Sequence, residues 1–428
     1  MRIARFRAGA ALLLAVALPL AACGGSPEES QGGEVVITCS VCQPYSDTDA
    51  IGTYRADLVK RFNEANAGRY QVKVIPNIDE NTPEGVQQLS RLALVDDLPD
   101  LFFLGELHLV PLDESAGLMD FRPRFEADTT FRDTFFPEML RSPRGLDRLL
   151  AVPDGRNVLG VFWNEQILAE AGVARPPTSY PELLQAAAAI RAAGKIPLAM
   201  DGLFVTLNWL AHLIGTQPGG ADYLGSGDLL AGGLENNPLW VTAVERLKEL
   251  HTSGFVNEDA FTGQFDRASQ PFLSGDAAAM ANGPWYAPVI SSETAEPGLA
   301  EAVTYVSAPG NGVAISGRGS GWASGAREAA KQDAVWAFVK FAYAWPEQVT
   351  RSTATAAFPP VRGEFDTADR KKLNPLALEL HEASEAVANV YPLLDSMPQS
   401  MWDEWDNYWP AYVQGSMDTR TFLARFNK

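Results

Sequence analysis

Three acidic side chains are candidates for chemistry on a polar substrate. Glu106 follows an apolar run, Asp154 lies in a Pro-Asp-Gly turn, and Asp201 follows a second apolar run. Two carboxylates can hydrolyse a glycosidic bond when their separation is right, and the sequence does not give that separation. Neither a G-x-S-x-G stretch nor an H-E-x-x-H stretch occurs in the chain. We therefore expect no catalysis and keep a secreted carbohydrate-active enzyme as an alternative.

The chain also contains a closely spaced cysteine pair. Cys39 and Cys42 form a Cys-Ser-Val-Cys run directly after the apolar residues 35–37. In an oxidising compartment we expect them to form a local disulfide. A redox site is the alternative, because thioredoxin-like sites use this spacing where a strand meets a helix. The four histidines lie far apart in the sequence, so we expect no metal site, and no motif indicates a cofactor.

Strand and helix patterns alternate along the chain and predict an α/β fold. Apolar runs at 35–38, 72–75 and 101–104 alternate with amphipathic helices, which is a βαβαβ order. Ligands of such sheets bind outside the carboxyl ends of the strands, which here are residues 40–47 and 105–108. A second unit begins near residue 149 and continues the alternation. The chain ends in helices.

The N-terminal residues carry a targeting pattern. Three arginines precede an apolar run at 10–20 that is too short to span a bilayer. The sequence Leu-Ala-Ala-Cys ending at Cys23 resembles the bacterial lipoprotein signal, which implies that Cys23 is lipidated. We expect a signal peptide at 1–22, a flexible tether at 23–33, and an extracytoplasmic protein anchored to the cell membrane. An ordinary cleaved leader is the alternative.

Composition limits the partners. The 428 residues are 46% hydrophobic, which allows large cores, and the length favours two lobes. Residues 1–22 hold three arginines and no acid, so their removal changes the net charge from −19 to −22. Such a surface repels nucleic acid and anionic lipid, and favours neutral or cationic ligands.

A long stretch of the sequence resembles a known family. Residues 272–285, Phe-Leu-Ser-Gly-Asp-Ala-Ala-Ala-Met-Ala-Asn-Gly-Pro-Trp, are similar to a signature of family 1 extracellular solute-binding proteins, the capture subunits of ABC sugar importers. Supporting similarities occur at 98–101, 151–164 and 334–341. The cysteine pair at 39 and 42 departs from the family pattern.

This resemblance implies a two-lobed periplasmic-binding-protein fold of type II, with a hinge and with the ligand in the cleft between the lobes. It places residues 34–148 and 310–344 in lobe one, and residues 149–309 and 345–428 in lobe two. It also implies a monomer that delivers a sugar to the transmembrane subunits of an ABC permease, without nucleic acid as a partner.

The candidate ligand-binding residues follow from the chemistry of sugars. A sugar presents apolar C–H faces that suit indole rings, and hydroxyl edges that suit amides and carboxylates. The resemblance makes Trp285, after Gly283-Pro284, the first candidate. The full set of candidates is Trp285, Glu106, Asn157, Arg156, Trp322, Gly321, Trp402, Tyr286, Asp201, Gln43 and Tyr45.

Several candidates have alternative structural roles. Trp402, Trp405 and Trp409 recur at helical spacing, which is typical of a core stripe, so only Trp402 is a candidate ligand residue. Asp201, Gln43 and Tyr45 could instead cap a helix or hydrogen-bond a loop. A polyamine or a glycerophospho compound is the alternative cargo, because tryptophans bind cations and Arg156 could bind a phosphate.

Overall fold

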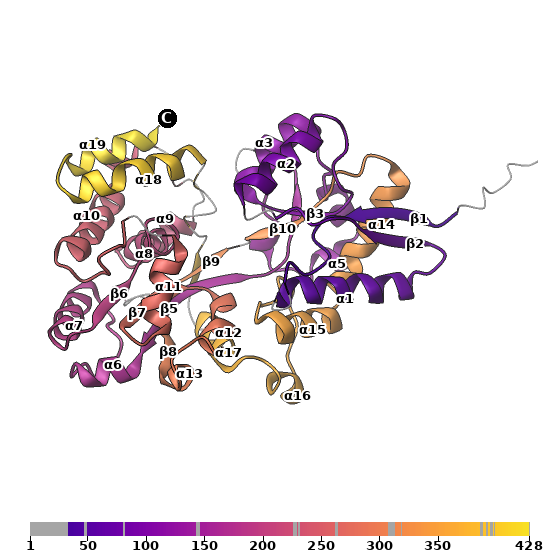
Figure 1. Ribbon diagram of the computed structural model, residues 1–428. Coiled ribbons are helices and arrows are strands. Elements are labelled where there is room, and N and C mark those ends of the chain that lie inside the picture. The colour runs from indigo at the N-terminus through magenta and orange to yellow at the C-terminus, as the bar shows by residue number, and fades with distance from the viewer. Residues whose placement is uncertain are drawn as a thin grey trace, which may run out of the picture. The chain divides into compact units, whose positions relative to one another are not determined.

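The structure is a computed structural model whose chain divides into two units, residues 1–33 and residues 34–428. The described residues are 33–46, 49–79, 82–142, 146–225, 229, 232–261, 264–306, 313–317, 319–385, 388–390, 393, 397 and 399–427. The expected signal peptide, the lipidation site Cys23 and the tether up to residue 32 lie outside this part of the chain. The fold below is that of the second unit (Figure 1).

The second unit contains both strands and helices throughout. The strands are β1 (Val35–Cys39), β2 (Tyr70–Val74), β3 (Phe102–Gly105), β4 (Ala151–Pro153), β5 (Asn157–Asn164), β6 (Ile196–Ala199), β7 (Ala277–Asn282), β8 (Val303–Val306), β9 (Val313–Gly317), β10 (Ser320–Ala323) and β11 (Ala388–Val390). The α-helices are α1 (Ala50–Ala65), α2 (Pro83–Ala93), α3 (Glu106–Ala116), α4 (Arg122–Ala127), α5 (Thr129–Arg132), α6 (Glu165–Glu170), α7 (Tyr180–Ala192), α8 (Phe204–Gly215), α9 (Gly220–Gly225), α10 (Pro238–Thr252), α11 (Phe265–Leu273), α12 (Ala287–Ile290), α13 (Leu299–Ala302), α14 (Ala329–Ala342), α15 (Trp345–Thr355), α16 (Thr367–Arg370), α17 (Pro375–Glu385), α18 (Gln399–Val413) and α19 (Thr419–Ala424). Short 3-10 helices are η1 (Pro137–Leu140), η2 (Leu234–Asn236), η3 (Pro284–Tyr286) and η5 (Arg425–Asn427).

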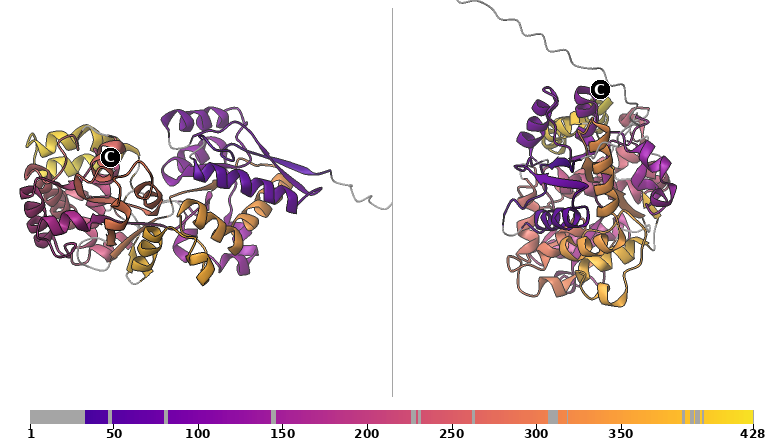
Figure 2. Two further views of the ribbon diagram at one scale, coloured as in Figure 1. Left: turned by 60° about the horizontal axis from the view of Figure 1, so that its bottom comes forward. Right: turned by 90° about the vertical axis from the view of Figure 1, so that its right-hand side faces the viewer.

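The expected βαβαβ order at the start of the unit is confirmed. It comprises β1, α1, β2, α2 and β3, and β1 pairs with β2 in parallel. Asp49 caps α1 and Thr82 caps α2, because each side chain accepts a hydrogen bond from a backbone N–H in the first turn. Helix α1 runs beside this strand pair in the views of Figure 2.

The pairing of β3 differs from the parallel strand that the βαβαβ order and the unbroken apolar run at 101–104 predict. Leu101, directly before β3, forms a single parallel bridge with Cys39. The ladder of β3 is instead antiparallel to β10, which lies in the middle of the sheet β3-β10-β4. Residues on both sides of this sheet are apolar, since two buried clusters cover it, and an apolar run alone does not distinguish strand direction.

The larger sheet has the order β11-β9-β5-β7-β6, with β8 also paired to β5. Strand β5 is buried along its whole length after Asn157. At Gly160 a side chain is excluded, because a Cβ there would lie about 2 Å from the ring of Tyr305. Helix α8 contacts β7 and α10, and every residue of α8 from Val205 to Gly215 is buried.

The tryptophan stripe of α18 belongs largely to the buried cluster around the larger sheet, which we call the second core, as expected from its spacing. Trp405 and Trp409 have no exposed surface, and their rings stack with centroids 4.6 Å apart. Trp402 remains half-buried against the same cluster. Trp402 is therefore more exposed than Trp405 and Trp409.

Sheet membership divides the chain differently from the lobe boundaries expected from the sequence. Strand β4 pairs with β10 and so joins the first core, the buried cluster around Ile37, Phe103 and Trp322. The sequence instead placed residue 149 onward in lobe two. Strand β9 pairs with β5 and β11 in the larger sheet, whereas residues 310–344 were placed in lobe one. Helix α15 packs on α1. Apolar patterning predicts strands but does not show which sheet each one joins.

Two buried histidines, His212 and His251, and the half-buried His381 make stability depend on pH. Burial lowers the pKa of His212 to about 3 and those of His251 and His381 to about 4; the positive charges of Arg156 and Arg370 add to the effect on His381. Between pH 6.5 and 4 the unfolded chain binds protons at these positions that the folded chain does not bind. We therefore expect the free energy of unfolding to fall steadily as the pH falls through this window.

The measurement is urea unfolding at pH 7.0, 6.0 and 5.0 with wild-type protein and His251→Leu. His251 packs between Phe261 and Trp409, so leucine keeps an apolar contact there and removes one titrating group. The variant is expected to lose less stability than the wild type between pH 7.0 and 5.0. Equal pH slopes for the two proteins would contradict the assignment to His251.

Candidate functional site

Strand directions bring the candidate loops of the first core to one edge. The carboxyl end of β1 is followed by residues 40–45, and β3 ends at Gly105, directly before Glu106. Because β10 is antiparallel to β3, its first residue, Ser320, pairs with Gly105 at the same edge. The end of β4 lies there too, since Pro153 pairs with Gly321.

A second edge is formed in the larger sheet by the start of β5 and the end of β7. These strands are antiparallel, and Gly160 pairs with Asn282, the last residue of β7. Residues 283–285 therefore leave the sheet at the end where Asn157 begins β5. Strand β6 is parallel to β7, so Asp201 follows its strand at this edge as well.

The connection from β4 to β5 joins the two edges directly. Only residues 154–156 separate the two strands. The Asp154 N–H donates to the Ser320 carbonyl (3.3 Å), and a Cβ at Gly319 would lie 2.2 Å from Asn157 Nδ2. The end of β3, the start of β10 and the start of β5 thus meet around this connection, and we take this junction as the candidate site.

A buried ion pair fastens the junction. Arg351, from α15, places a guanidinium nitrogen 2.9 Å from Asp154 Oδ2, and both side chains are mostly buried. The Arg156 N–H donates to the Phe358 carbonyl (2.9 Å), which ties the same connection to the segment after α15. The Tyr343 hydroxyl donates to the carbonyl groups of residues 152 and 153.

Trp285 is half-buried at the second edge. Its ring covers Gly283, because a Cβ at that glycine would lie 2.3 Å from the indole, and the ring packs against the second core. The Gly283-Pro284 turn and the short helix η3 thus leave part of the indole exposed. A partly exposed indole at a sheet edge can stack on the face of a sugar ring.

Two aromatic candidates prove to be core residues. Tyr286 is 1% exposed, its hydroxyl lies 2.9 Å from Ser269 Oγ, and burial raises its pKa to about 12. Trp322 is also 1% exposed and packs edge-on against Phe103 and Phe338. Side chains enclosed to this degree present no face to a ligand, so we remove both from the site. The sequence does not show the burial of Trp322, because this depends on the middle position of β10 in its sheet.

Gly321 has a packing role in the same strand. A Cβ at this position would lie 2.5 Å from the Val152 carbonyl oxygen of β4. The glycine therefore allows β10 and β4 to approach, and the approach of a ligand to its backbone is not needed to explain it.

Asp201 caps a helix, which was its alternative role. It is 2% exposed and its Oδ1 accepts hydrogen bonds from the N–H groups of Leu203, Val205 and Thr206 at the start of α8. Burial is the main influence on its pKa, which is raised, while these hydrogen bonds act in the opposite direction. With Oδ1 engaged in this way, we assign the carboxylate a structural role.

Arg156 is enclosed at the junction. It is 4% exposed, its guanidinium lies over the ring of Phe136 with 4.8 Å to the centroid, and Nε is 3.8 Å from Glu138 Oε1. The side chain therefore packs against η1 of the first core. Asn157, its neighbour, is half-buried and remains a candidate for hydroxyl groups.

Gln43 and Tyr45 lie in the loop after β1. The Gln43 side-chain amide donates to the Ile75 carbonyl at 3.5 Å and is half-buried. Tyr45 is 49% exposed, and its hydroxyl donates to the Ile78 carbonyl at 3.1 Å. The loop thus holds an exposed aromatic ring by its hydroxyl end at the first edge.

For two candidates, the contacts do not decide whether they bind a ligand. Glu106 is the first residue of α3, beside the pairing of Gly105 with Ser320, and its side chain lies outside the described part of the structure. Trp402 donates from Nε1 to the Met397 carbonyl at 3.2 Å and packs against the second core. Both remain predictions.

Two buried asparagines near the second edge escaped the sequence reasoning. Asn282 Oδ1 accepts from the Gly283 N–H, and its Nδ2 has no acceptor among the described residues. Neither amide atom of Asn208, in α8, has a partner within the same part of the chain. Buried amides usually have partners, so unpaired ones mark a place for polar ligand groups or water. A polar residue in the otherwise apolar run of α8 was the available signal.

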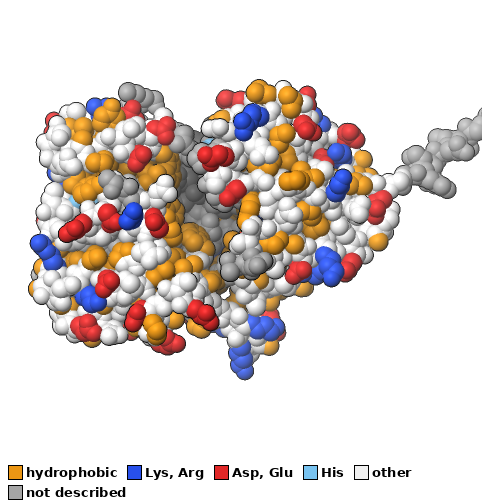
Figure 3. Space-filling view, viewed as in Figure 1, with side chains coloured by type: hydrophobic (Ala, Val, Ile, Leu, Met, Phe, Trp, Pro, Cys, Tyr) orange, Lys and Arg blue, Asp and Glu red, His pale blue; other side chains and the backbone are white. Residues whose placement is uncertain are grey.

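The surface also carries a hollow in the space-filling view. Hydrophobic side chains gather along one of its margins (Figure 3).

Among the described residues, no helix is long and apolar enough to cross a membrane, and no three His, Cys, Asp or Glu side chains cluster as metal ligands would.

Comparison with known proteins agrees with the α/β architecture described above. The profile of a family described as bacterial extracellular solute-binding protein matches residues 57–377. Among curated proteins, none matches the sequence. Many solved structures do match in fold.

Three of these structures illustrate the match. A chitin oligosaccharide binding protein is 17% identical, with 92% of this chain and 98% of that chain covered and a TM-score of 0.75. A Streptococcus pneumoniae solute-binding protein in complex with the blood group A-trisaccharide is 17% identical, with coverages of 92% and 98% and a TM-score of 0.70. A probable secreted solute-binding lipoprotein from Streptomyces coelicolor is 19% identical, with coverages of 92% and 97% and a TM-score of 0.70. The two-lobed fold expected from the sequence is thereby confirmed.

Proposed function

We propose that this chain, which belongs to the bacterial extracellular solute-binding proteins, captures a mono- or oligosaccharide and delivers it to the permease of an ABC importer. The observation that carries the proposal is the junction where the two sheet edges meet, with the half-buried Trp285 at one edge and the exposed ring of Tyr45 at the other. Two aromatic faces and the amide of Asn157 suit a ring with apolar faces and hydroxyl edges.

The lobes of the proposed binding cycle follow from sheet membership. Lobe one comprises residues 34–153 and 320–355 together with the stretch around Val361, which bridges Phe135. Lobe two comprises residues 157–317 and 375–427. Residues 154–156, which connect β4 to β5, belong to the hinge. Ligand contacts with both lobes favour the closed state only by their differential affinity for it. This proposal assigns the protein no chemical step.

The nature of the similar structures supports a sugar as the cargo. Similar folds include the chitin oligosaccharide binding protein and a cyclic alpha-maltosyl-1,6-maltose binding protein from Arthrobacter globiformis, the latter at 19% identity and a TM-score of 0.70. A glycerophospho compound is less favoured, because the guanidinium of Arg156 is buried against Phe136. A polyamine remains compatible with the acidic surface and is included as an arm of the test.

The targeting pattern supports attachment to the membrane. Leu-Ala-Ala-Cys ending at Cys23 and a polar stretch after it suit a lipid anchor with a flexible tether. The lipoprotein from Streptomyces coelicolor has the same fold. In the proposed cycle the protein acts as a monomer outside the cytoplasm, tethered near its permease. Mass spectrometry of the N-terminal peptide tests the anchor, since a lipidated Cys23 adds the mass of its acyl chains.

A thermal-shift panel tests the cargo. We expect chitotriose, xylotriose or maltotriose at about 100 times its Kd to raise Tm by about 5 °C, since a ligand of the folded state stabilises it. Spermidine and glycerophosphocholine are the matched comparisons. A shift with spermidine alone would replace the sugar by a polyamine, and the release of shorter sugars during incubation would instead indicate an enzyme.

A further inference from the structure

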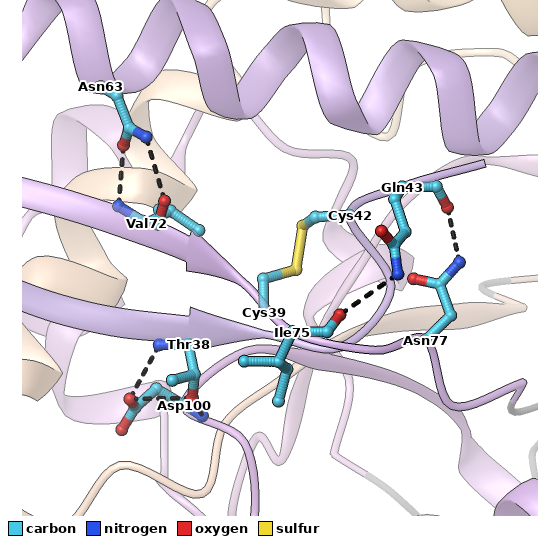
Figure 4. Close-up of a disulfide and its surroundings, with 9 residues drawn as sticks. All are labelled: Thr38, Cys39, Cys42, Gln43, Asn63, Val72, Ile75, Asn77 and Asp100. Atoms are coloured by element: carbon cyan, nitrogen blue, oxygen red, sulfur yellow. Dashed lines mark hydrogen bonds between the residues drawn. A yellow bond between two sulfur atoms is a disulfide. The ribbon is translucent and has the colours of Figure 1, made fainter.

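The disulfide between Cys39 and Cys42 lies directly beneath the loop that carries Gln43 and Tyr45. Cys39 is the last residue of β1, and both cysteines have no exposed surface, with their Cα atoms 5.8 Å apart. Figure 4 shows the bond spanning from the end of β1 to the turn just before Gln43. The bond therefore fixes the direction in which the chain leaves the strand.

The same turn is tied to the segment after β2 by hydrogen bonds on both sides of the disulfide. The Ile75 N–H donates to the Cys39 carbonyl (2.9 Å), and the Ile78 N–H donates to the Ser40 carbonyl (2.8 Å). The Asn77 side-chain amide donates to the Gln43 carbonyl (2.6 Å), as Figure 4 shows. Residues 75–78 thus serve as a fixed support for the turn.

Tyr45 is held by this support at its far end. Its hydroxyl donates to the Ile78 carbonyl, and its N–H donates to Asp49 Oδ2 at the cap of α1 (3.0 Å). The ring itself is 49% exposed. Fixing an exposed aromatic ring in advance lowers the entropy lost when a ligand stacks on it.

We infer that the Cys39–Cys42 disulfide is a positioning element for sugar binding, which holds Tyr45 as the stacking platform of the first edge. The inference rests on the proposed function, because it assigns Tyr45 to the sugar site. The disulfide acts through the loop and does not touch the sugar. Its contribution to binding is therefore present only while the ring of Tyr45 is present.

A double-mutant cycle tests this dependence with the sugar that the wild type binds among chitotriose, xylotriose and maltotriose. We expect C39A/C42A to raise Kd about 10-fold and Y45A to raise it about 10-fold, with the triple variant no weaker than Y45A. Y45F keeps the ring and loses the hydrogen bond to Ile78, so it should resemble C39A/C42A. Effects of C39A/C42A and Y45A that multiply in the triple variant would overturn the inference.

Hydrogen exchange separates the loop's position from overall stability. In C39A/C42A the amides of Ile75, Ile78 and Tyr45 should exchange about 10-fold faster, and Tm should fall by about 5 °C. The matched control is N63A, because Asn63 holds β2 to α1 by two hydrogen bonds with Val72 (Figure 4). N63A should lower Tm comparably and leave both Kd and those three amides unchanged.

The outcomes distinguish this inference from the proposed function. If the wild type binds a sugar and N63A weakens binding as much as C39A/C42A does, the disulfide acts only through stability and the inference is rejected. If the wild type binds none of the three sugars, the proposed cargo is rejected. In that case unchanged exchange at Ile75, Ile78 and Tyr45 would show that the disulfide does not position the loop either.

Discussion

Replacing Trp285 with alanine is expected to weaken sugar binding by about 100-fold, which corresponds to about 2.7 kcal/mol. The half-buried indole packs over Gly283 and retains an exposed part that a sugar face would cover. Removing it loses the apolar area that both partners bury, at about 25 cal/mol for each Å². The measurement is isothermal titration calorimetry with the sugar that gives the largest thermal shift.

The control for this experiment is Trp336→Ala. Trp336 is also half-buried, but it packs against Phe125 and Phe131 of the first core. It should lose stability without losing affinity, whereas Trp285→Phe should retain part of the binding. Unchanged affinity in Trp285→Ala, with a folded protein and an intact circular dichroism spectrum, would remove Trp285 from the site.

Arg351→Met is expected to lower the free energy of unfolding by about 3 to 5 kcal/mol, because it leaves the carboxylate of Asp154 buried without its cation. Only 8% of the Arg351 side chain and 14% of the Asp154 side chain are exposed. Replacing both residues, as Asp154→Asn with Arg351→Met, should cost less than the single change. Urea unfolding of the three proteins measures the difference.

An exposed ion pair provides the control for this prediction. Arg267 lies 3.4 Å from Asp259, and their side chains are 58% and 44% exposed. Arg267→Ala should change stability by less than about 1 kcal/mol, as exposed pairs generally do. If Arg351→Met costs no more than Arg267→Ala, the buried pair does not hold the junction together.

The sequence was sufficient for the order of the first elements and for the family. The βαβαβ order and the core positions of Trp405 and Trp409 follow from local patterns of apolar residues. These are properties of single segments, which do not depend on what pairs with them. The signature around residues 272–285 likewise lies within one continuous stretch, and the family profile matches across it.

The site was less predictable because it depends on contacts between distant segments. Trp322 and Tyr286 stood next to glycine or a turn in the sequence. The middle position of β10 buries Trp322, and packing against Phe162 and Phe272 buries Tyr286. Asp201 could equally cap a helix or bind a ligand, and only its three backbone donors decide between these roles. The ion pair of Asp154 joins residues 197 positions apart, which no local pattern indicates.

The place of β10 in its sheet affects the order in which the parts of the protein can fold during synthesis. Residues 320–323 form the middle strand between β3 and β4, and α14 at 329–342 packs on β1. A nascent chain that has emerged only as far as residue 300 therefore has the outer strands of that sheet but not the one between them. The N-terminal part must therefore wait for most of the chain to be synthesised before its sheet is complete.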